Sequence, residues 1–477
     1  MQTRNLIAGE WVDADSGETF DVLNPANDKV VASVPNGGAA ETRRAIDAAY
    51  AAFPAWRDLT AADRAGKLRA FYNLMHRDAD RLARLMTAEQ GKPLSEARGE
   101  IGYAASFLEW SAEEGKRIYG ETIPASAANK RILVLRQPVG VCAIVTPWNF
   151  PSAMITRKIG PALAAGCTVV IKPAEDTPLS AIALGELAIE AGIPAGVVNI
   201  VTGEAKDIGG EMLSNKKVRK LSFTGSTEVG QLLMKGASQN LLRLSMELGG
   251  HAPFIVFEDA DIDQAVAGAV GSKFRNGGQT CICPNRFYVH ANVREEFVAK
   301  LGKAMEGMRV GEGTQEGVQV GPMINDDAID KIERHVEDAR SKGAKVPVGG
   351  KRAKVAGLAD RFFTPTLLDG MTGEMLCARE ETFGPVAPVG SFRTDDEAIE
   401  AANNSDFGLA GYFYTRDASR LMRVAERLEY GIVGANDAAP STAQAPFGGV
   451  KHSGFGREGG KYVMDEYTAI KYISWGL

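Results

Sequence analysis

The stretch Val141-Cys-Ala-Ile-Val-Thr-Pro-Trp-Asn-Phe-Pro151 decides the fold class of this chain. Its first five residues form a short apolar run, which is typical of a strand buried on both faces. Similar runs follow at 168–171, 197–201 and 219–223, and segments with helical character separate them. Strands that alternate with helices predict a parallel sheet covered on both faces, so we expect a Rossmann-like α/β domain of the dinucleotide-binding type.

A second region with the same alternation follows further along the chain. Strands are predicted at 254–257, 286–290 and 386–392, and helices at 262–274, 294–308, 326–342 and 418–427. This pattern indicates a second α/β domain.

Two strand-like runs belong to neither domain. They lie at 130–136, before Pro138, and at 466–475, in the C-terminal tail. Strands at a domain edge and at a chain end commonly pair with one another or with a neighbouring subunit. We therefore expect a small β element that supports an oligomer.

The composition is that of an ordinary globular protein with two or three domains. The chain has 477 residues and a formal net charge of −6, which argues against a dedicated nucleic-acid partner. No apolar run approaches the length of a membrane span, and the first residues lack the apolar segment of a secretory signal. The five cysteines form no disulfide framework, so we expect a reducing, cytoplasmic location. The five histidines lack zinc-ligand spacing, so we expect no metal.

A thiol and a carboxylate stand out as candidates for catalysis. Cys281 follows Gly277-Gly278, and Glu247 lies between a strand-like run at 241–246 and another glycine pair. A thiolate attacks carbonyl carbon, and a carboxylate can activate the water that releases an acyl group from sulfur. The alternatives are a small buried cysteine in a core and a surface carboxylate at a strand end.

Several polar residues follow the predicted strands of the first domain, at the edge where ligands bind to such sheets. Asn149, between two prolines, could donate its amide to an oxyanion, whereas Trp148 could simply pack. Lys172 and Glu175 follow the second strand and suit a sugar or a phosphate. Gly225-Ser226 follows the fourth strand and opens a helix, where a pyrophosphate would be favoured. Because G-x-G-x-x-G is absent, this pattern alone is a weak nucleotide signal.

Together these residues resemble the aldehyde dehydrogenase superfamily. The matching segments span nearly the whole chain in the family order: Thr146-Pro-Trp-Asn-Phe-Pro151, Ile171-Lys-Pro-Ala-Glu175, Phe223-Thr-Gly-Ser226, Met246-Glu-Leu-Gly-Gly250, Gly278-Gln-Thr-Cys281, Glu380-Glu-Thr-Phe-Gly-Pro385 and Pro446-Phe-Gly-Gly-Val-Lys451. The resemblance implies two parallel-sheet α/β domains and a small β oligomerisation element, in a homodimer or homotetramer. It also implies a cofactor-binding domain at 1–117 and 138–248, a catalytic domain at 249–436, and oligomerisation or bridging segments at 118–137 and 437–477.

The resemblance assigns catalytic roles to three residues. Cys281 is the implied nucleophile, which forms a thiohemiacetal with the aldehyde and a thioester after hydride transfer. Glu247 is the implied general base for hydrolysis of that thioester, and its presence favours a free acid over transfer to coenzyme A. Asn149, with the backbone N–H of Cys281, is the implied oxyanion donor. A nicotinamide-independent thiol esterase and a non-enzymatic protein with the same fold are the competing interpretations.

The resemblance also implies a nicotinamide cofactor. The implied binding residues are Thr146, Trp148, Lys172, Glu175, Gly225, Ser226, Leu248, Glu381 and Phe383. A carboxylate bonds well to a ribose 2′-hydroxyl and repels a 2′-phosphate, so Glu175 predicts NAD, with NADP as the alternative.

Within the superfamily the chain is most similar to the succinate-semialdehyde dehydrogenases. That similarity implies that Arg157, Arg275 and Ser441 bind the distal carboxylate of the substrate, because a planar guanidinium suits bidentate carboxylate binding. The two arginines could instead be solvated charges on helix faces. The segment 437–445 departs from the subfamily, so glutarate or 2-oxoglutarate semialdehyde, or a broader aldehyde range, stays open. In this subfamily Cys283 can form a reversible disulfide with the nucleophile, so Cys283 is a candidate redox switch.

Overall fold

The computed structural model describes residues 2–477, and its first sheet has five parallel strands at the centre. In spatial order they are β9 (Val198–Ile200), β8 (Thr168–Lys172), β7 (Val141–Val145), β10 (Val218–Thr224) and β11 (Arg243–Glu247). Antiparallel strands extend both edges: β1 (Asn5–Ile7) and β2 (Glu10–Val12) on one side and β21 (Gly454–Phe455) on the other. The strands predicted for this domain are confirmed.

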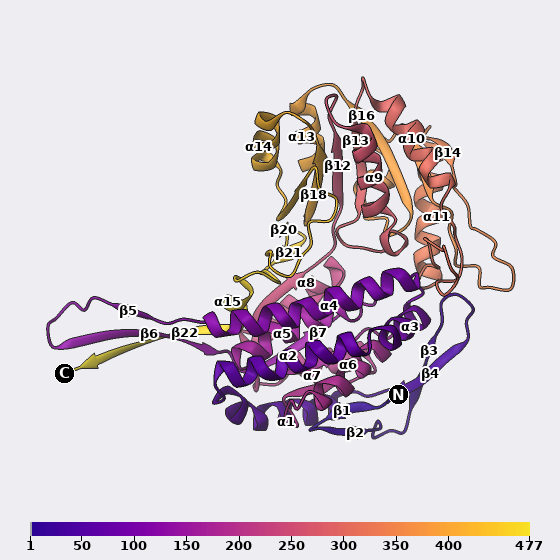
Figure 1. Cartoon of the computed structure of the whole chain (residues 1–477). Coiled ribbons are helices and arrows are strands. Elements are labelled where there is room, and N and C mark those ends of the chain that lie inside the picture. The colour runs from indigo at the N-terminus through magenta and orange to yellow at the C-terminus, as the bar shows by residue number, and fades with distance from the viewer. Residues whose placement is uncertain (1) are drawn as a thin grey trace.

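Alternate side chains of these strands enter two separate apolar cores. Cys142 and Ile144 of β7 pack on one face of the sheet, whereas Val141 and Ala143 pack on the other, because successive side chains of a strand point in opposite directions. The first face is covered by α2 (Ala61–Arg77), α3 (Ala79–Gln90), α4 (Leu94–Glu114), α5 (Ala153–Ala165) and α6 (Pro178–Glu190), and the second by α1 (Ala39–Arg57), α7 (Ala205–Ser214) and α8 (Thr227–Ala237) (Figure 1).

The strand order of the first sheet reverses between β7 and β10. From β7 the chain moves outward through β8 to β9 and then returns to β10 and β11 on the other side. The loops that follow β7 and β10 therefore diverge at the carboxyl ends of these two strands. Open α/β sheets bind ligands at this position.

The second sheet is also mainly parallel. Its order is β14 (Lys345–Val348), β15 (Thr366–Asp369), β16 (Val386–Phe392), β13 (Pro284–His290), β12 (Ala252–Val256), β18 (Ala410–Tyr414) and β19 (Ile432–Ala435), of which only β14 is antiparallel. One face is covered by α9 (Ile262–Lys273) and α10 (Arg294–Glu306), and the other by α11 (Asp326–Ser341), α13 (Asp395–Asn403) and α14 (Ala418–Arg427). The predicted second α/β domain is confirmed.

The two sheets meet at the ends of their strands, not along their outermost strands. Only residues 248–251 join the end of β11 to the start of β12, so the carboxyl edge of the first sheet faces the amino edge of the second. The approach is close: a Cβ at Gly250 would lie 2.1 Å from the carbonyl oxygen of Cys281. Segments that precede strands of the second sheet therefore reach the ligand-binding edge of the first.

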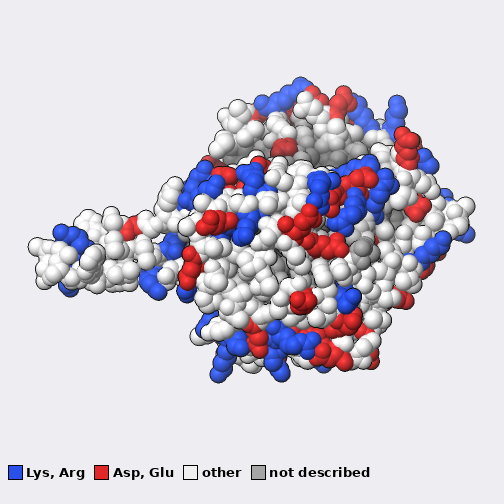
Figure 2. Space-filling model, turned by 60° about the horizontal axis from the view of Figure 1, so that its bottom comes forward, with Lys and Arg blue, Asp and Glu red and all other residues white. Residues whose placement is uncertain are grey.

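A three-stranded antiparallel arm projects from this body (Figure 1). It consists of β5 (Glu121–Ile123), β6 (Lys130–Pro138) and β22 (Thr468–Gly476), and β22 pairs with β6 along its whole length. The predicted pairing of the two isolated strands is thus confirmed. The face of the arm in Figure 2 is mostly free of charged side chains. Across residues 2–477 no helix is both long and apolar enough to cross a membrane.

Candidate active site

Cys281 is held by a tight loop between α9 and β13. Asn276, Gly277 and Gly278 all have positive φ values, of 51°, 61° and 80°. A Cβ at Gly278 would lie 2.2 Å from the carbonyl oxygen of Gly384, so only glycine fits there. The other four cysteines are buried, whereas part of Cys281 reaches the surface. The loop geometry thus separates this thiol from the core cysteines.

Burial raises the pKa of the Cys281 thiol to about 12. The charge of Arg157 opposes this shift, while Glu381 and Glu247 add to it. These three groups therefore lie within electrostatic reach of the sulfur. Because the thiol is neutral at physiological pH, it needs a base that accepts its proton before it can act as a nucleophile.

Glu247, the last residue of β11, is a buried carboxylate without a hydrogen-bond partner. Its side chain is buried, and neither carboxylate oxygen has a partner among residues 2–477. Burial and then the nearby charge of Glu458 raise its pKa well above the ordinary value. An unpartnered buried carboxylate costs free energy, and such groups concentrate at functional sites. Burial thus makes the predicted base a stronger proton acceptor than an exposed carboxylate.

Asn149 lies beside the nucleophile loop. Its Nδ2 donates to the carbonyl oxygen of Gln279, two residues before Cys281, at 3.0 Å. One N–H of the amide is used in this bond, and the other has no acceptor among residues 2–477. The structure thus brings Asn149, Glu247 and Cys281 to the same boundary between the sheets.

The predicted cofactor residues of the first domain follow the carboxyl ends of its strands. Lys172 ends β8, and its Nζ lies 2.5 Å from Oε1 of the half-exposed Glu175. Ser226 caps α8 by accepting from the N–H of Val229 at 3.3 Å. The hydroxyls of Thr146 and Thr224, directly after β7 and at the end of β10, are buried and lack partners within the described part of the chain. Unsatisfied hydroxyls beside a helix N-terminus fit a polar anionic ligand such as a dinucleotide.

The second sheet contributes the remaining cofactor candidates. Glu381 accepts from the N–H of Gly250 at 3.1 Å, and burial raises its pKa to about 7. Phe383 packs edge-on against Trp148, with ring centroids 5.6 Å apart, and so joins the loops of both sheets. Leu248 is buried in the crossing segment.

The predicted substrate arginines lie near the thiol in different settings. Arg157 of α5 is buried, so the alternative of a solvated charge is wrong for this residue. Its Nη2 lies 2.8 Å from Oε2 of Glu458, and its guanidinium stacks on the ring of Phe447 at 3.9 Å. Arg275 is partly exposed and lies over Phe150 at 4.6 Å. Both guanidiniums lower the pKa of Cys281, so both lie near its sulfur.

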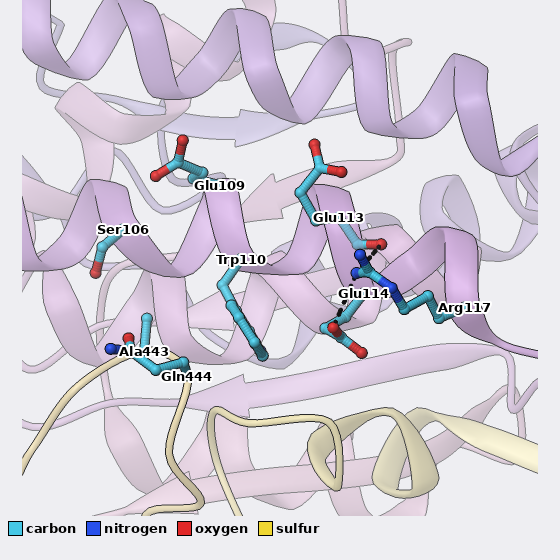
Figure 3. A pocket seen from close by; sticks show the side chains of 8 residues that line it. All are labelled: Ser106, Glu109, Trp110, Glu113, Glu114, Arg117, Ala443 and Gln444. Atoms are coloured by element: carbon cyan, nitrogen blue, oxygen red, sulfur yellow. Dashed lines mark hydrogen bonds and ion pairs between the residues drawn. The ribbon is translucent and has the colours of Figure 1, made fainter.

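Tyr103 of α4 is a residue that the sequence did not single out. Its hydroxyl shares a hydrogen bond of 2.5 Å with Oγ of Ser441. Figure 3 shows how the loop after Ser441 continues along α4, where Ala443 and Gln444 border a hollow of about 360 Å³. An aromatic residue in a helix carries no sequence signal for such a role, because its partner is 338 positions away.

Cys283 is buried, and its thiol donates to the carbonyl oxygen of Lys273 at 3.4 Å. Burial also raises its pKa. This hydrogen bond would have to break before a disulfide with Cys281 formed. The redox switch stays a prediction.

The fold and the site define the class of protein: a nicotinamide-dependent oxidoreductase. The chain belongs to the aldehyde dehydrogenase family, which matches residues 11–473. It is 58% identical to the Escherichia coli (strain K12) succinate-semialdehyde dehydrogenase [NADP(+)] GabD, over 99% of this chain and 97% of that protein. It is 57% identical to a glutarate-semialdehyde dehydrogenase of Pseudomonas aeruginosa, over 98% of this chain and 97% of that protein. The crystal structure of succinate-semialdehyde dehydrogenase from Burkholderia pseudomallei superposes with a TM-score of 0.98 at 54% identity, covering 100% of this chain and 98% of that one.

Replacing Glu247 by Gln should stabilise the protein in a pH-dependent way. The pKa of Glu247 is raised in the folded protein, so the folded protein binds a proton at this carboxyl more tightly than the unfolded chain does. The carboxylate therefore destabilises the fold increasingly as pH rises above its ordinary pKa. In urea unfolding, Glu247→Gln should match the parent protein near pH 4.5 and exceed its unfolding free energy by about 1–3 kcal/mol at pH 8.5.

The matched control is Glu337→Gln, which removes an exposed carboxylate. It should change the unfolding free energy by less than about 0.5 kcal/mol at either pH. A Glu247→Gln variant that is less stable than the parent at pH 8.5 would contradict the burial of an unpartnered charge.

Proposed function

We propose that this chain oxidises succinate semialdehyde to succinate with NAD as cofactor. The observation that carries the proposal is a pair of guanidinium groups, on the buried Arg157 and on Arg275 over Phe150, whose charges lower the pKa of the Cys281 thiol. Such groups favour an aldehyde with a distal carboxylate over a neutral one. The named activities of the Escherichia coli and Burkholderia pseudomallei relatives support this substrate.

Acylation of the enzyme begins with the thiol proton. Glu247 accepts it, and the Cys281 thiolate adds to the carbonyl carbon, so that a C–S bond forms and the carbonyl oxygen becomes an oxyanion. The free N–H of the Asn149 amide and the backbone N–H of Cys281 stabilise that oxyanion. Bound NAD supplies the acceptor for the hydride that leaves the tetrahedral carbon.

Hydrolysis then regenerates the thiol. Glu247 first passes the thiol proton to solvent and then removes a proton from water, so that the resulting hydroxide attacks the thioester carbon. The C–S bond breaks, and the leaving thiolate takes that proton back from Glu247. Burial raises the pKa of Glu247, so its carboxylate is a stronger proton acceptor than an exposed one. The same carboxylate thus serves the two half-reactions.

Ser441, Tyr103 and the two arginines form the proposed site for the distal carboxylate. The two hydroxyls share one hydrogen bond, so one O–H donates within the pair and the other stays free to donate to an anion. Within the described part of the chain, Nε of Arg157 has no hydrogen-bond partner, although the guanidinium contacts Glu458. Glutarate semialdehyde is the second candidate substrate. The name of the Pseudomonas aeruginosa relative, a glutarate-semialdehyde dehydrogenase, supports it.

Replacing Arg275 by Ala should discriminate against acid aldehydes. A charge-assisted hydrogen bond is worth about 1.5–3 kcal/mol, so KM for succinate semialdehyde should rise about tenfold or more. KM for butanal, a neutral aldehyde of equal length, should change less than about threefold. Reduced-nicotinamide absorbance across a panel with succinate, glutarate and 2-oxoglutarate semialdehydes measures both effects and ranks the substrates.

Tyr103→Phe is the companion variant, because it removes one hydroxyl and leaves the ring. It should raise KM for the preferred acid aldehyde and spare butanal. Equal losses for acid and neutral aldehydes in both variants would reject the carboxylate site, and a lack of any aldehyde-dependent absorbance would reject the function.

Glu175 is the proposed ligand of the adenosine ribose, with Lys172 beside it. Thr146, Trp148, Gly225, Ser226 and Leu248 surround the proposed dinucleotide path, and Glu381 and Phe383 hold its nicotinamide end. The carboxylate of Glu175 is half exposed at the end of β8, where it can accept from a 2′-hydroxyl and would repel a 2′-phosphate.

Cofactor competition tests this assignment. The parent protein should prefer NAD, and Glu175→Gln should raise kcat/KM for NADP relative to NAD about tenfold, since removing a like charge is worth about 1 kcal/mol or more. Asp176→Asn is the matched control, which removes a neighbouring charge and should leave the ratio within about twofold. A parent protein that prefers NADP would refute the role of Glu175.

We also propose that the arm joins copies of this chain into a homodimer or homotetramer. On β22 the side chains of Ile470, Tyr472 and Trp475 are 71%, 60% and 58% exposed in the single chain. A strand edge with this apolar content needs a cover. Sedimentation velocity should find a dimer or tetramer, and a stable monomer would exclude the proposed oligomer.

We also propose a cytoplasmic location, which the five free cysteines support.

A further inference from the structure

A buried ion pair lies behind the proposed oxyanion donor. Lys92 and Glu100 have side chains that are 0% and 1% exposed, with Nζ 2.6 Å from Oε2. Lys92 lies between α3 and α4, and Glu100 lies in the second turn of α4. Neither residue belongs to a motif of the active site. A buried ion pair of this kind adds little to the free energy of unfolding, because desolvation of the two charges offsets their attraction. Stability alone therefore does not explain why this pair is present.

Both charges are also bonded to the loop that carries Asn149. The Nζ of Lys92 donates to the backbone oxygen of Asn149 at 2.7 Å and lies over the Phe150 ring at 3.9 Å. The second oxygen of Glu100 accepts from the N–H groups of Ser152 and Ala153, at 3.0 and 3.2 Å, where α5 begins. The pair thus fixes the Asn149 loop at both ends.

The same stretch of chain holds the nucleophile loop. Glu96, one helical turn before Glu100, accepts from the N–H of Asn276 at 2.6 Å. The Nδ2 of Asn276 in turn donates to the backbone oxygen of Asn149 at 3.0 Å. Residues 92–100 therefore link the backbone of Asn149 to the strained turn that positions Cys281.

We infer that Lys92 and Glu100 are positioning residues, which hold the Asn149 amide at the place where the oxyanion forms. Neither touches the substrate, so both act through Asn149. This inference rests on the proposed function of Asn149. A shift of about 1 Å in a catalytic group costs about a hundredfold in rate, so small displacements of this loop suffice for a large effect.

The test is a double-mutant cycle that combines Lys92→Met/Glu100→Gln with Asn149→Ala. Removing both charges avoids an unpaired buried charge, and Gln at position 100 keeps an acceptor for the start of α5. The readout is the first-turnover rate of NADH formation from succinate semialdehyde. The paired variant should lower that rate about 10–100-fold, with KM for the aldehyde within about threefold, because an oxyanion donor acts in the transition state.

In the Asn149→Ala background the paired variant should lower the rate by less than about threefold. Equal losses in the two backgrounds, or no loss in the parent background, would overturn the positioning role. If Asn149→Ala alone keeps the parental rate, the proposed function of Asn149 fails instead, so the two failures are distinguishable.

Glu89→Gln is the matched control. Glu89 is also a fully buried carboxylate that caps a helix, accepting from the N–H groups of Leu179 and Ser180 at 2.8 Å, but it does not contact Asn149. It should leave the first-turnover rate within about twofold.

Should Lys92→Met/Glu100→Gln fail to fold, Glu96→Leu enters the same cycle. It should lower the rate about tenfold in the parent background and less than threefold with Asn149→Ala, and equal losses there would likewise overturn the role.

Discussion

The short crossing between the two sheets is the constraint on which the rest of the structure depends. Because residues 248–251 alone join β11 to β12, the carboxyl edge of one sheet is pressed against the amino edge of the other. Glu247 reaches the boundary from the first sheet, and Cys281 reaches it from the second. Open α/β sheets usually bind ligands at the carboxyl ends of their strands, as we propose for the first sheet, whereas the second sheet presents Cys281 at the amino ends of its strands.

This boundary carries groups that weaken the fold. Glu247 has no hydrogen-bond partner among the described residues, and burial raises the pKa values of Glu247, Glu381 and Cys281. Each group is costly to ionise where it lies, and that cost is what sets its proton affinity for chemistry. The large apolar cores on both faces of each sheet offset the cost. Stability and reactivity therefore draw on different residues of the chain.

Much of this arrangement could be predicted from local sequence. Apolar runs such as 141–145 give strands, and glycine pairs mark the tight loops at Cys281 and Glu247. The sequence did not reveal β18 and β19, because Gly411 and Gly434 interrupt their apolar character. It also did not reveal Tyr103 or Lys92, because their partners lie 338 and 57 positions away and no local pattern reports such contacts. The ion pair of Arg157 with Glu458 is hidden for the same reason.

The central claim is that the sulfur of Cys281 carries the acyl group between the two half-reactions. Mass spectrometry of the parent protein, quenched with acid within the first turnover after it is mixed with NAD and succinate semialdehyde, tests it most directly, because acid preserves a thioester bond. The account predicts a succinyl thioester on the peptide that contains Cys281, formed in step with NADH. Formation of NADH with every cysteine unmodified throughout the first turnover, or an adduct on another cysteine, would contradict it.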